Sequence, residues 1–246
     1  MKYRYLATGL AAVLTLLGSL YVRNALRETA TFQRAQTEQA RPASQEGAED
    51  GRVIVIDAGH GGEDPGKIGV NQALEKEINL SIAKRCKLLL EQNGYVVYLT
   101  REGDADLAEA GSKNRKAQDM RARISVLQER QPVLGISIHQ NSYPSERCRG
   151  AQVFYLQGST EGKQLAQTLQ KQLKSELKDG NTRQAKADAS YYLLKHAPCP
   201  FVIVECGFLS NREEAELLLT EEYQEKVAFA IHLGVIEYIN TEQEME

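Results

Sequence analysis

The sequence lacks a strong charge of either sign, because 30 lysines and arginines stand against 33 aspartates and glutamates and leave a formal net charge of −3. Domains that bind nucleic acid usually carry a basic face, and no basic cluster of that kind is present. The composition therefore does not indicate a protein that binds polyanions. Tryptophan is also absent. No segment is repeated along the chain, which excludes an array of sequence repeats.

Cysteine is scarce. The four cysteines, Cys86, Cys148, Cys199 and Cys206, have spacings that match neither a disulfide framework nor a zinc finger. Cys86 and Cys206 lie inside apolar segments, where we expect small buried hydrophobic side chains. In an exported protein, a disulfide stays open as an alternative to free thiols.

A long apolar run lies near the start of the chain. Residues 6–22 contain no charged side chain and are followed by Arg23, so the run is about as long as one membrane span. Residues 1–23 are expected to be a signal anchor or a signal peptide. The anchor is favoured because the run is longer than a typical signal-peptide core and no clear cleavage site precedes Arg23. Both alternatives place the rest of the chain outside the cytoplasm, membrane-anchored or secreted.

Residues 24–51 are polar and show little apolar periodicity, which is typical of a linker. From residue 52 onward, predicted strands alternate with predicted helices. The strands cover residues 53–57, 95–100, 133–138, 152–156, 191–194 and 201–204, and the helices cover 75–92, 117–129, 162–177, 213–219 and 223–239. This pattern predicts a single α/β domain over residues 52–240, with a mostly parallel twisted sheet of about six strands and helices on both faces. Residues 241–246 are expected to be a tail.

Three predicted strands lead into polar side chains that can do chemistry. His60 lies in a glycine-rich loop just after the first strand, and His139 and Glu205 each directly follow a later one. Because the carboxyl ends of parallel strands meet at one edge of a sheet, we expect these side chains to lie close together.

A fourth polar residue, Glu75, begins the first predicted helix. It shares a face with Asn79 and Ile82 at the edge of the apolar stripe, whereas Glu77 lies on the solvated face and Glu63 lies in the glycine-rich loop. Two imidazoles and one carboxylate are a common ligand set of catalytic zinc and leave a fourth position for water. We therefore predict that His60, Glu75 and His139 are the ligands of a Zn²⁺ ion.

Glu205 is the candidate general base for such a site. It follows four apolar residues, where an ionised carboxylate is costly unless it is paired or lies beside a metal. Pairing with an arginine, such as Arg101 or Arg123, is the alternative structural role.

The histidines have structural alternatives as well. The alternative for His60 is that it caps a loop. The alternative for His139 is that it is a core histidine whose hydrogen bonds are satisfied by the protein. For His196, in a polar loop, and His232, on the last predicted helix, we expect structural roles. The residues alone thus indicate an exported zinc hydrolase whose amide, ester or similar substrate is not specified.

Six motifs resemble those of a known family, and they occur in that family's order. They are DAGHGGEDPGKIG at 57–69, LEKEINL at 74–80, LTRE at 99–102, SIHQNS at 137–142, GAQVFY at 150–155 and VECGFLSN at 204–211. They resemble the zinc-dependent N-acetylmuramoyl-L-alanine amidases of the amidase-3 type, over residue 52 to about residue 240. The resemblance implies a phosphorylase/hydrolase-like α/β fold and hydrolysis of the amide between N-acetylmuramic acid and L-alanine in peptidoglycan.

Residue roles also follow from the resemblance. The zinc ligands of the family fall on His60, Glu75 and His139, and its catalytic carboxylate falls on Glu205. No further cofactor is implied. The chain looks most like the spore-cortex branch, which implies a role in muramic-δ-lactam formation and germination, on the cortex side of the forespore.

The expected partners are cortex peptidoglycan as substrate, the membrane through the N-terminal segment, and no nucleic acid. An activator protein is a further hypothesis, with the polar loops 101–116 and 181–190 as the places where it would bind. Two alternatives stay open, a zinc peptidase acting on peptidoglycan stem peptides and a non-catalytic peptidoglycan-binding domain.

Overall fold

The computed structural model describes residues 53–245. The chain divides into two units, Met1–Ala48 and Glu49–Glu246, and the described residues all belong to the second. The expected anchor at 1–23 and linker at 24–51 lie outside the described residues. Within residues 53–245, no helix is both long enough and apolar enough to cross a membrane.

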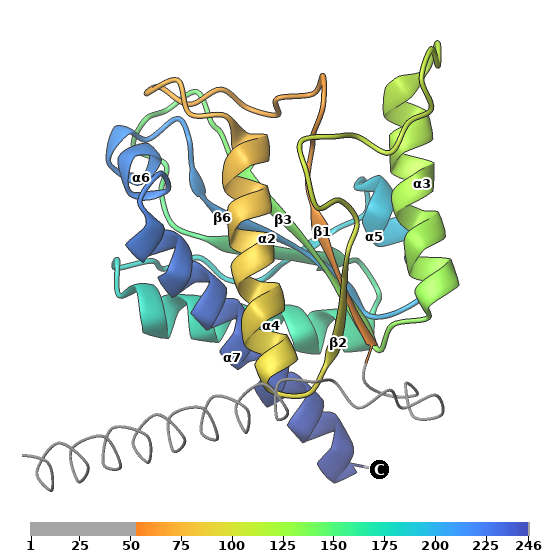
Figure 1. The fold of residues 1–246 in the computed structure, drawn as a ribbon. Coiled ribbons are helices and arrows are strands. Elements are labelled where there is room, and N and C mark those ends of the chain that lie inside the picture. Colours follow the sequence, from red (N-terminus) through yellow and green to blue (C-terminus); the bar gives the residue numbers. More distant parts are fainter. Residues whose placement is uncertain (1–52, 246) are drawn as a thin grey trace, which may run out of the picture. The chain divides into compact units, whose positions relative to one another are not determined.

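One six-stranded sheet forms the centre of the domain, with the strand order β2-β1-β3-β6-β4-β5 (Figure 1). The strands are β1 (Val53–Ala58), β2 (Val96–Leu99), β3 (Leu134–Asn141), β4 (Gln152–Leu156), β5 (Lys186–Asp188) and β6 (Phe201–Phe208). All pairs are parallel except β4 with β6. The prediction of a single α/β domain with a mostly parallel sheet of about six strands is confirmed.

Helices cover both faces of this sheet (Figure 1). On one face lie α2 (Glu75–Gln92), α4 (Thr160–Leu177) and α7 (Glu221–Met245), and on the other lie α3 (Arg115–Arg130) and α5 (Tyr192–His196); the short α6 (Arg212–Leu217) follows β6. Because side chains alternate along a strand, Ile54 and Ile56 join the core under α2, α4 and α7, and Val55 joins the core under α3 and α5. Every residue of β1 and β6 is buried, as continuous apolar runs predict for strands covered on both faces.

The prediction of a strand at 191–194 is wrong. Tyr191 precedes the helix α5 and residues 192–194 lie inside it, and the edge strand is instead the polar β5. Leu193 and Leu194 are both buried, which a helix end packed under α3 allows and a half-buried strand does not. A short apolar run is ambiguous between the two structures, and a polar three-residue edge strand has no apolar periodicity to reveal it.

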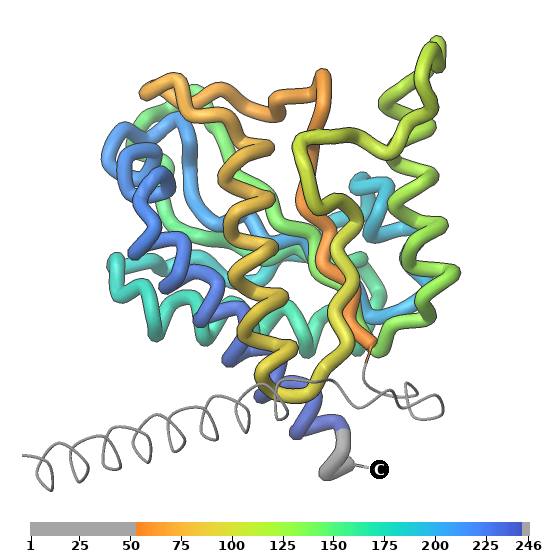
Figure 2. Tube along the Cα trace, in the orientation of Figure 1, coloured from red at the N-terminus to blue at the C-terminus, as the bar shows by residue number. Residues whose placement is uncertain are grey.

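The parallel strands β1, β3 and β6 finish at the same end of the sheet. The segment that follows β1, coloured orange, and the segment that precedes α3, coloured yellow-green, both lie at this end (Figure 2). Residues that are distant along the chain are therefore brought together there.

Candidate active site

His60, Glu75 and His139 come together at this end of the sheet. Oε1 of Glu75 lies 3.2 Å from Nε2 of His60 and 3.0 Å from Nδ1 of His139. One potential ligand atom from each residue lies within 4.8 Å of the others. The two imidazole rings meet edge to face, with centroids 4.9 Å apart. This spacing and this donor set suit a single divalent ion, with open positions for water and substrate.

His60 is held by its backbone and by its second ring nitrogen. Its φ of 63° is unusual for a residue with a side chain, and the carbonyl oxygen of His60 accepts a hydrogen bond of 2.9 Å from Arg123. Nδ1 lies 2.9 Å from Oδ2 of Asp64, so Nε2 is turned toward Glu75. A carboxylate behind a histidine in this way fixes the tautomer in metal sites. Burial lowers the pKa of His60, but hydrogen bonds with Glu75 and Asp64 outweigh it and raise the pKa.

Glu75 is the most deeply buried member of the cluster, with 1% of its surface exposed. It begins α2, where the helix dipole favours a negative charge. Oε1 accepts a hydrogen bond of 3.0 Å from the backbone of Gln140, and Oε2 accepts one of 2.7 Å from the backbone of Lys67. Burial raises the pKa of Glu75, but hydrogen bonds with His139 and His60 outweigh it and hold the pKa well below its ordinary value. The group is therefore an ionised carboxylate whose geometry is fixed by the backbone.

The two rejected glutamates lie elsewhere. Glu77 is exposed on the far side of α2, and Glu63 is exposed in the loop after β1, 3.7 Å from Arg115. Neither belongs to the cluster of potential ligand atoms, which contains Glu75.

Two glycines make room for the cluster. A Cβ atom on Gly59 would lie 2.2 Å from Cε1 of His139, and one on Gly66 would lie 2.6 Å from Oε2 of Glu75. Gly66 also has a φ of 68°, where a side chain would be strained. The loop after β1 thus forms a cradle around the three potential ligands, which supports the fit to a metal ion.

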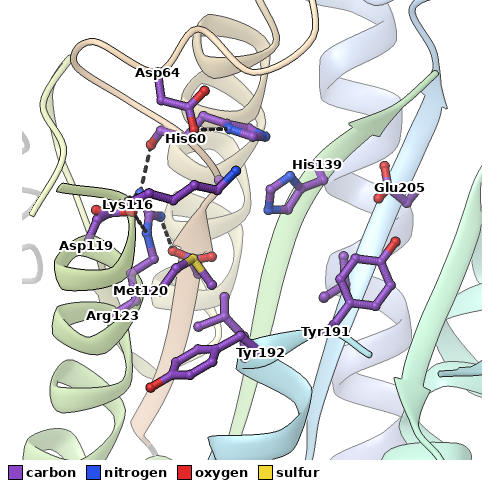
Figure 3. Close-up of a pocket in the computed structure, with 14 residues that line it drawn as sticks. His60, Asp64, Lys116, Asp119, Met120, Arg123, His139, Tyr191, Tyr192 and Glu205 are labelled. Carbon is purple, nitrogen blue, oxygen red and sulfur yellow. Dashed lines mark hydrogen bonds and ion pairs between the residues drawn. The ribbon is translucent and has the colours of Figure 1, made fainter. Parts of the chain in front are cut away.

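Glu205 lies directly beside His139, because the two residues are paired in register across β3 and β6 (Figure 3). It is 8% exposed, and its Oε2 has no hydrogen-bond partner among residues 53–245. Burial raises the pKa of Glu205 to about 7, with a smaller opposing effect from His139. A buried carboxylate without a partner, beside a potential metal site, is suited to accept a proton.

The alternative in which Glu205 pairs with Arg101 or Arg123 is wrong. Arg101 donates to the carbonyl oxygens of Ala58 and Gly59. Arg123 forms its ion pairs with Asp57 and Asp119. The carboxylate of Glu205 is therefore left facing the pocket.

A pocket of about 220 Å³ opens in front of these residues, on the face covered by α3 and α5. Figure 3 shows His60, His139 and Glu205 around this pocket together with residues of α3 and α5. The lining also includes Lys116, Met120, Tyr191, Tyr192 and Leu193. The volume and the mixed polar and apolar walls suit part of an extended substrate.

Arg123 is a supporting residue that the sequence did not reveal. It is 2% exposed, yet it donates to Asp57 and to the backbone oxygens of Ala58 and His60. Burial raises the pKa of Asp57, but the charge of Arg123 and a hydrogen bond from Ser137 outweigh it and lower the pKa to about 2. A signal was present, since Arg123 precedes Ile124 on the buried side of a predicted helix, where an arginine needs a partner.

The remaining histidines lie outside the cluster, as expected. His196 is exposed, and its Nδ1 lies 2.8 Å from the carbonyl oxygen of Tyr192. His232 is buried on α7, and burial lowers its pKa. All four cysteines are free, and Cys86 and Cys206 are buried as the sequence predicted.

Comparison with known proteins identifies related sequences. The sequence profile of the N-acetylmuramoyl-L-alanine amidase family matches residues 54–237. The germination-specific N-acetylmuramoyl-L-alanine amidase of Bacillus subtilis (strain 168) is 40% identical over 191 residues, which cover 76% of this chain and 80% of that protein. The amidase LytC of the same organism is 33% identical over 190 residues, which are 76% of this chain but only 36% of LytC.

Solved structures of amidases are also similar to this chain. The CwlD amidase from Clostridioides difficile, solved in complex with the GerS lipoprotein, has a TM-score of 0.75 and 36% identity, covering 77% of this chain and 99% of that chain. The amidase AmiC2 of Nostoc punctiforme has a TM-score of 0.68 and 29% identity, covering 77% of this chain and 97% of that chain.

Proposed function

The chain belongs to the N-acetylmuramoyl-L-alanine amidase family, and from this premise we propose that it hydrolyses peptidoglycan with a zinc ion held by His60, Glu75 and His139. As an amidase of this family, it cleaves the amide bond between N-acetylmuramic acid and L-alanine. The observation that carries the zinc proposal is the convergence of two imidazoles and an ionised carboxylate beside the unpaired carboxylate of Glu205.

The protein's own residues have distinct tasks in this reaction. Zinc, when bound, supplies Lewis acidity, which allows water to be deprotonated near neutral pH. Oε2 of Glu205 accepts the proton of the attacking water, because this carboxylate lies beside His139 and has no hydrogen-bond partner among residues 53–245. The same carboxyl group then passes this proton to the nitrogen of L-alanine as the C–N bond breaks. Asp64 keeps His60 in the tautomer that leaves Nε2 free.

The biological setting is a further part of the proposal. The similarity to a germination-specific amidase supports cortex peptidoglycan as the substrate, with a role in muramic-δ-lactam formation and germination. The similarity to an amidase solved with a lipoprotein supports an activator protein as partner. We propose that the apolar run at residues 6–22 directs the catalytic domain out of the cytoplasm and associates it with the membrane.

The test combines metal analysis with product identification. The purified protein is expected to contain one zinc ion per chain and to release stem peptides with a free L-alanine amino group from peptidoglycan, as read by mass spectrometry. Glu205→Gln is expected to keep its zinc and to lose at least about 100-fold in rate, because the general base is removed. New amino groups within the stem peptide would indicate a peptidase instead, and cleavage by Glu205→Gln at the parent rate would contradict the mechanism.

A further inference from the structure

Tyr191 borders the active-site pocket on the side opposite His60. Figure 3 shows its side chain extending from the start of α5, with the hydroxyl group directed toward Glu205. Within the part of the chain that the structure describes, this hydroxyl forms no hydrogen bond. A polar group at the wall of a catalytic pocket without a protein partner is available to a ligand.

The position of Tyr191 is fixed from two sides. Its ring packs edge to face against Phe154, with centroids 5.6 Å apart. Its backbone N–H donates to Oδ1 of Asp188 at 3.2 Å, and its carbonyl oxygen accepts from Lys195 in the first turn of α5. The next residues of α5, Leu193 and Leu194, are buried in the core under α3. The hydroxyl is therefore held in place before substrate arrives, as a preorganised donor must be.

The phenol is a donor at any working pH. Burial raises the pKa of Tyr191 to about 12, and the negative charges of Glu205, Asp188 and Glu75 contribute to this shift. The hydroxyl of Tyr191 thus stays neutral and can donate a hydrogen bond, while the nearby Glu205 accepts the proton of the attacking water.

Among the other pocket donors, Lys116 reaches into the pocket on an exposed and flexible four-carbon side chain, whereas Arg123 and Tyr192 are engaged or point away. The guanidinium of Arg123 is used by Asp57, Asp119 and backbone oxygens. Tyr192 stacks on His196, with ring centroids 4.1 Å apart, and in Figure 3 its hydroxyl points away from His139 and Glu205. Tyr191 is left as the donor that is both rigid and close to Glu205.

We propose that Tyr191 is a catalytic residue whose hydroxyl donates a hydrogen bond to the carbonyl oxygen of the scissile amide as that oxygen becomes negatively charged. The inference rests on the proposed function. The proton stays on Tyr191 throughout. Glu205 takes the proton of the attacking water, the new C–O bond forms as the carbonyl oxygen gains charge, and the C–N bond then breaks with transfer of that proton to the amine. Tyr191 lowers the barrier by stabilising the charged oxygen.

Tyr191→Phe tests the proposal, because it keeps the ring against Phe154 and removes only the hydroxyl. Its kcat on a soluble muropeptide is expected to fall about 10²- to 10³-fold, as when an oxyanion donor is removed. KM, zinc content and the shape of the pH–rate profile are expected to stay as in the parent. The matched control is Tyr98→Phe, which removes the hydroxyl of a half-buried tyrosine outside the pocket whose ring packs under Arg130. Tyr98→Phe is expected to keep the parent kcat.

Three results would overturn the proposal. A kcat of Tyr191→Phe within about threefold of the parent would show that the hydroxyl is not used. A loss matched by reduced zinc content would assign Tyr191 to the architecture of the metal site. A shift of the acidic limb of the pH–rate profile would assign it to positioning Glu205. All three differ from failure of the proposed function, which would appear as full activity of Glu205→Gln.

Discussion

At the scale of single residues, the geometry of the potential metal site depends on a buried charge network. Arg123 connects Asp57, at the end of β1, with the carbonyl oxygen of His60, in a left-handed backbone conformation. The unusual conformation of His60 persists because the surrounding hydrogen bonds determine it. Two buried residues, Asp57 and Arg123, thus hold a residue that we place at the metal.

Removal of Arg123 is expected to destabilise the folded protein. Arg123→Met leaves Asp57 and Asp119 without their cation, which is expected to reduce the free energy of unfolding by about 3–5 kcal/mol. Chemical denaturation in urea measures the change. Arg121→Met, at an exposed position two residues earlier, is the matched control and is expected to be nearly neutral. Equal stability of the two variants would contradict the role of the network.

The low pKa of Asp57 predicts how stability depends on pH. In the folded protein the pKa is about 2, against an ordinary value of 3.8, so the ionised form stabilises the fold above about pH 4. This contribution, about 2 kcal/mol for a difference of nearly two pKa units, is lost as the pH falls from about 4 to about 2. Urea unfolding at a series of pH values is expected to show this loss in the parent and a flatter dependence in Asp57→Asn. Identical slopes for the two proteins would contradict the prediction.

At the scale of elements, the loop between β1 and α2 is shaped to leave space for ligands. Gly59→Ala places a Cβ atom in the ring of His139, so the imidazole must move. Zinc affinity is expected to fall about 10- to 100-fold, the usual loss when support of a metal ligand is removed. Gly103→Ala is the control, because a Cβ atom at Gly103 meets nothing within 4 Å. Competition with a fluorescent chelator measures both affinities, and an unchanged affinity of Gly59→Ala would contradict the account.

The elements also show how far sequence reasoning reaches. The helix α2 begins at Glu75 and ends at Gln92, as predicted, because an apolar stripe and the Asn93-Gly94 stop signal mark it. The short elements α5 and β5 were not predicted correctly, because they depend on packing under α3 and on hydrogen bonds at a sheet edge. Local sequence carries neither signal.

The residues of the site also divide into those that local sequence marks and those that depend on how the chain packs. The convergence of His60, His139 and Glu205 could be predicted, because each follows an apolar run and strand ends meet at one edge of a parallel sheet. For Arg123 the sequence indicated a buried arginine that needs a partner, but not that the partner is Asp57, 66 positions away. The position of Tyr191 depends on the placement of α5, which the sequence did not predict.

At the scale of the whole domain, the sheet brings residues that are distant in sequence close together in space. Residues 60, 75, 139 and 205 come from β3, β6 and the segments that follow β1, and meet at one end of the sheet. The face under α2, α4 and α7 forms the larger core, and the face under α3 and α5 carries the pocket. The larger core and the pocket thus lie on opposite faces of the sheet, while Glu75 reaches the site from the start of α2.

The central claim is that His60, Glu75 and His139 hold one zinc ion within reach of Glu205. A crystal structure of the protein grown with zinc, with diffraction recorded on both sides of the zinc absorption edge, tests it most directly. The account predicts one strong anomalous peak bonded to both imidazoles at about 2.0–2.1 Å and to the Glu75 carboxylate at about 2.0–2.2 Å. A peak at other residues, or none between these three at full zinc loading, would contradict it.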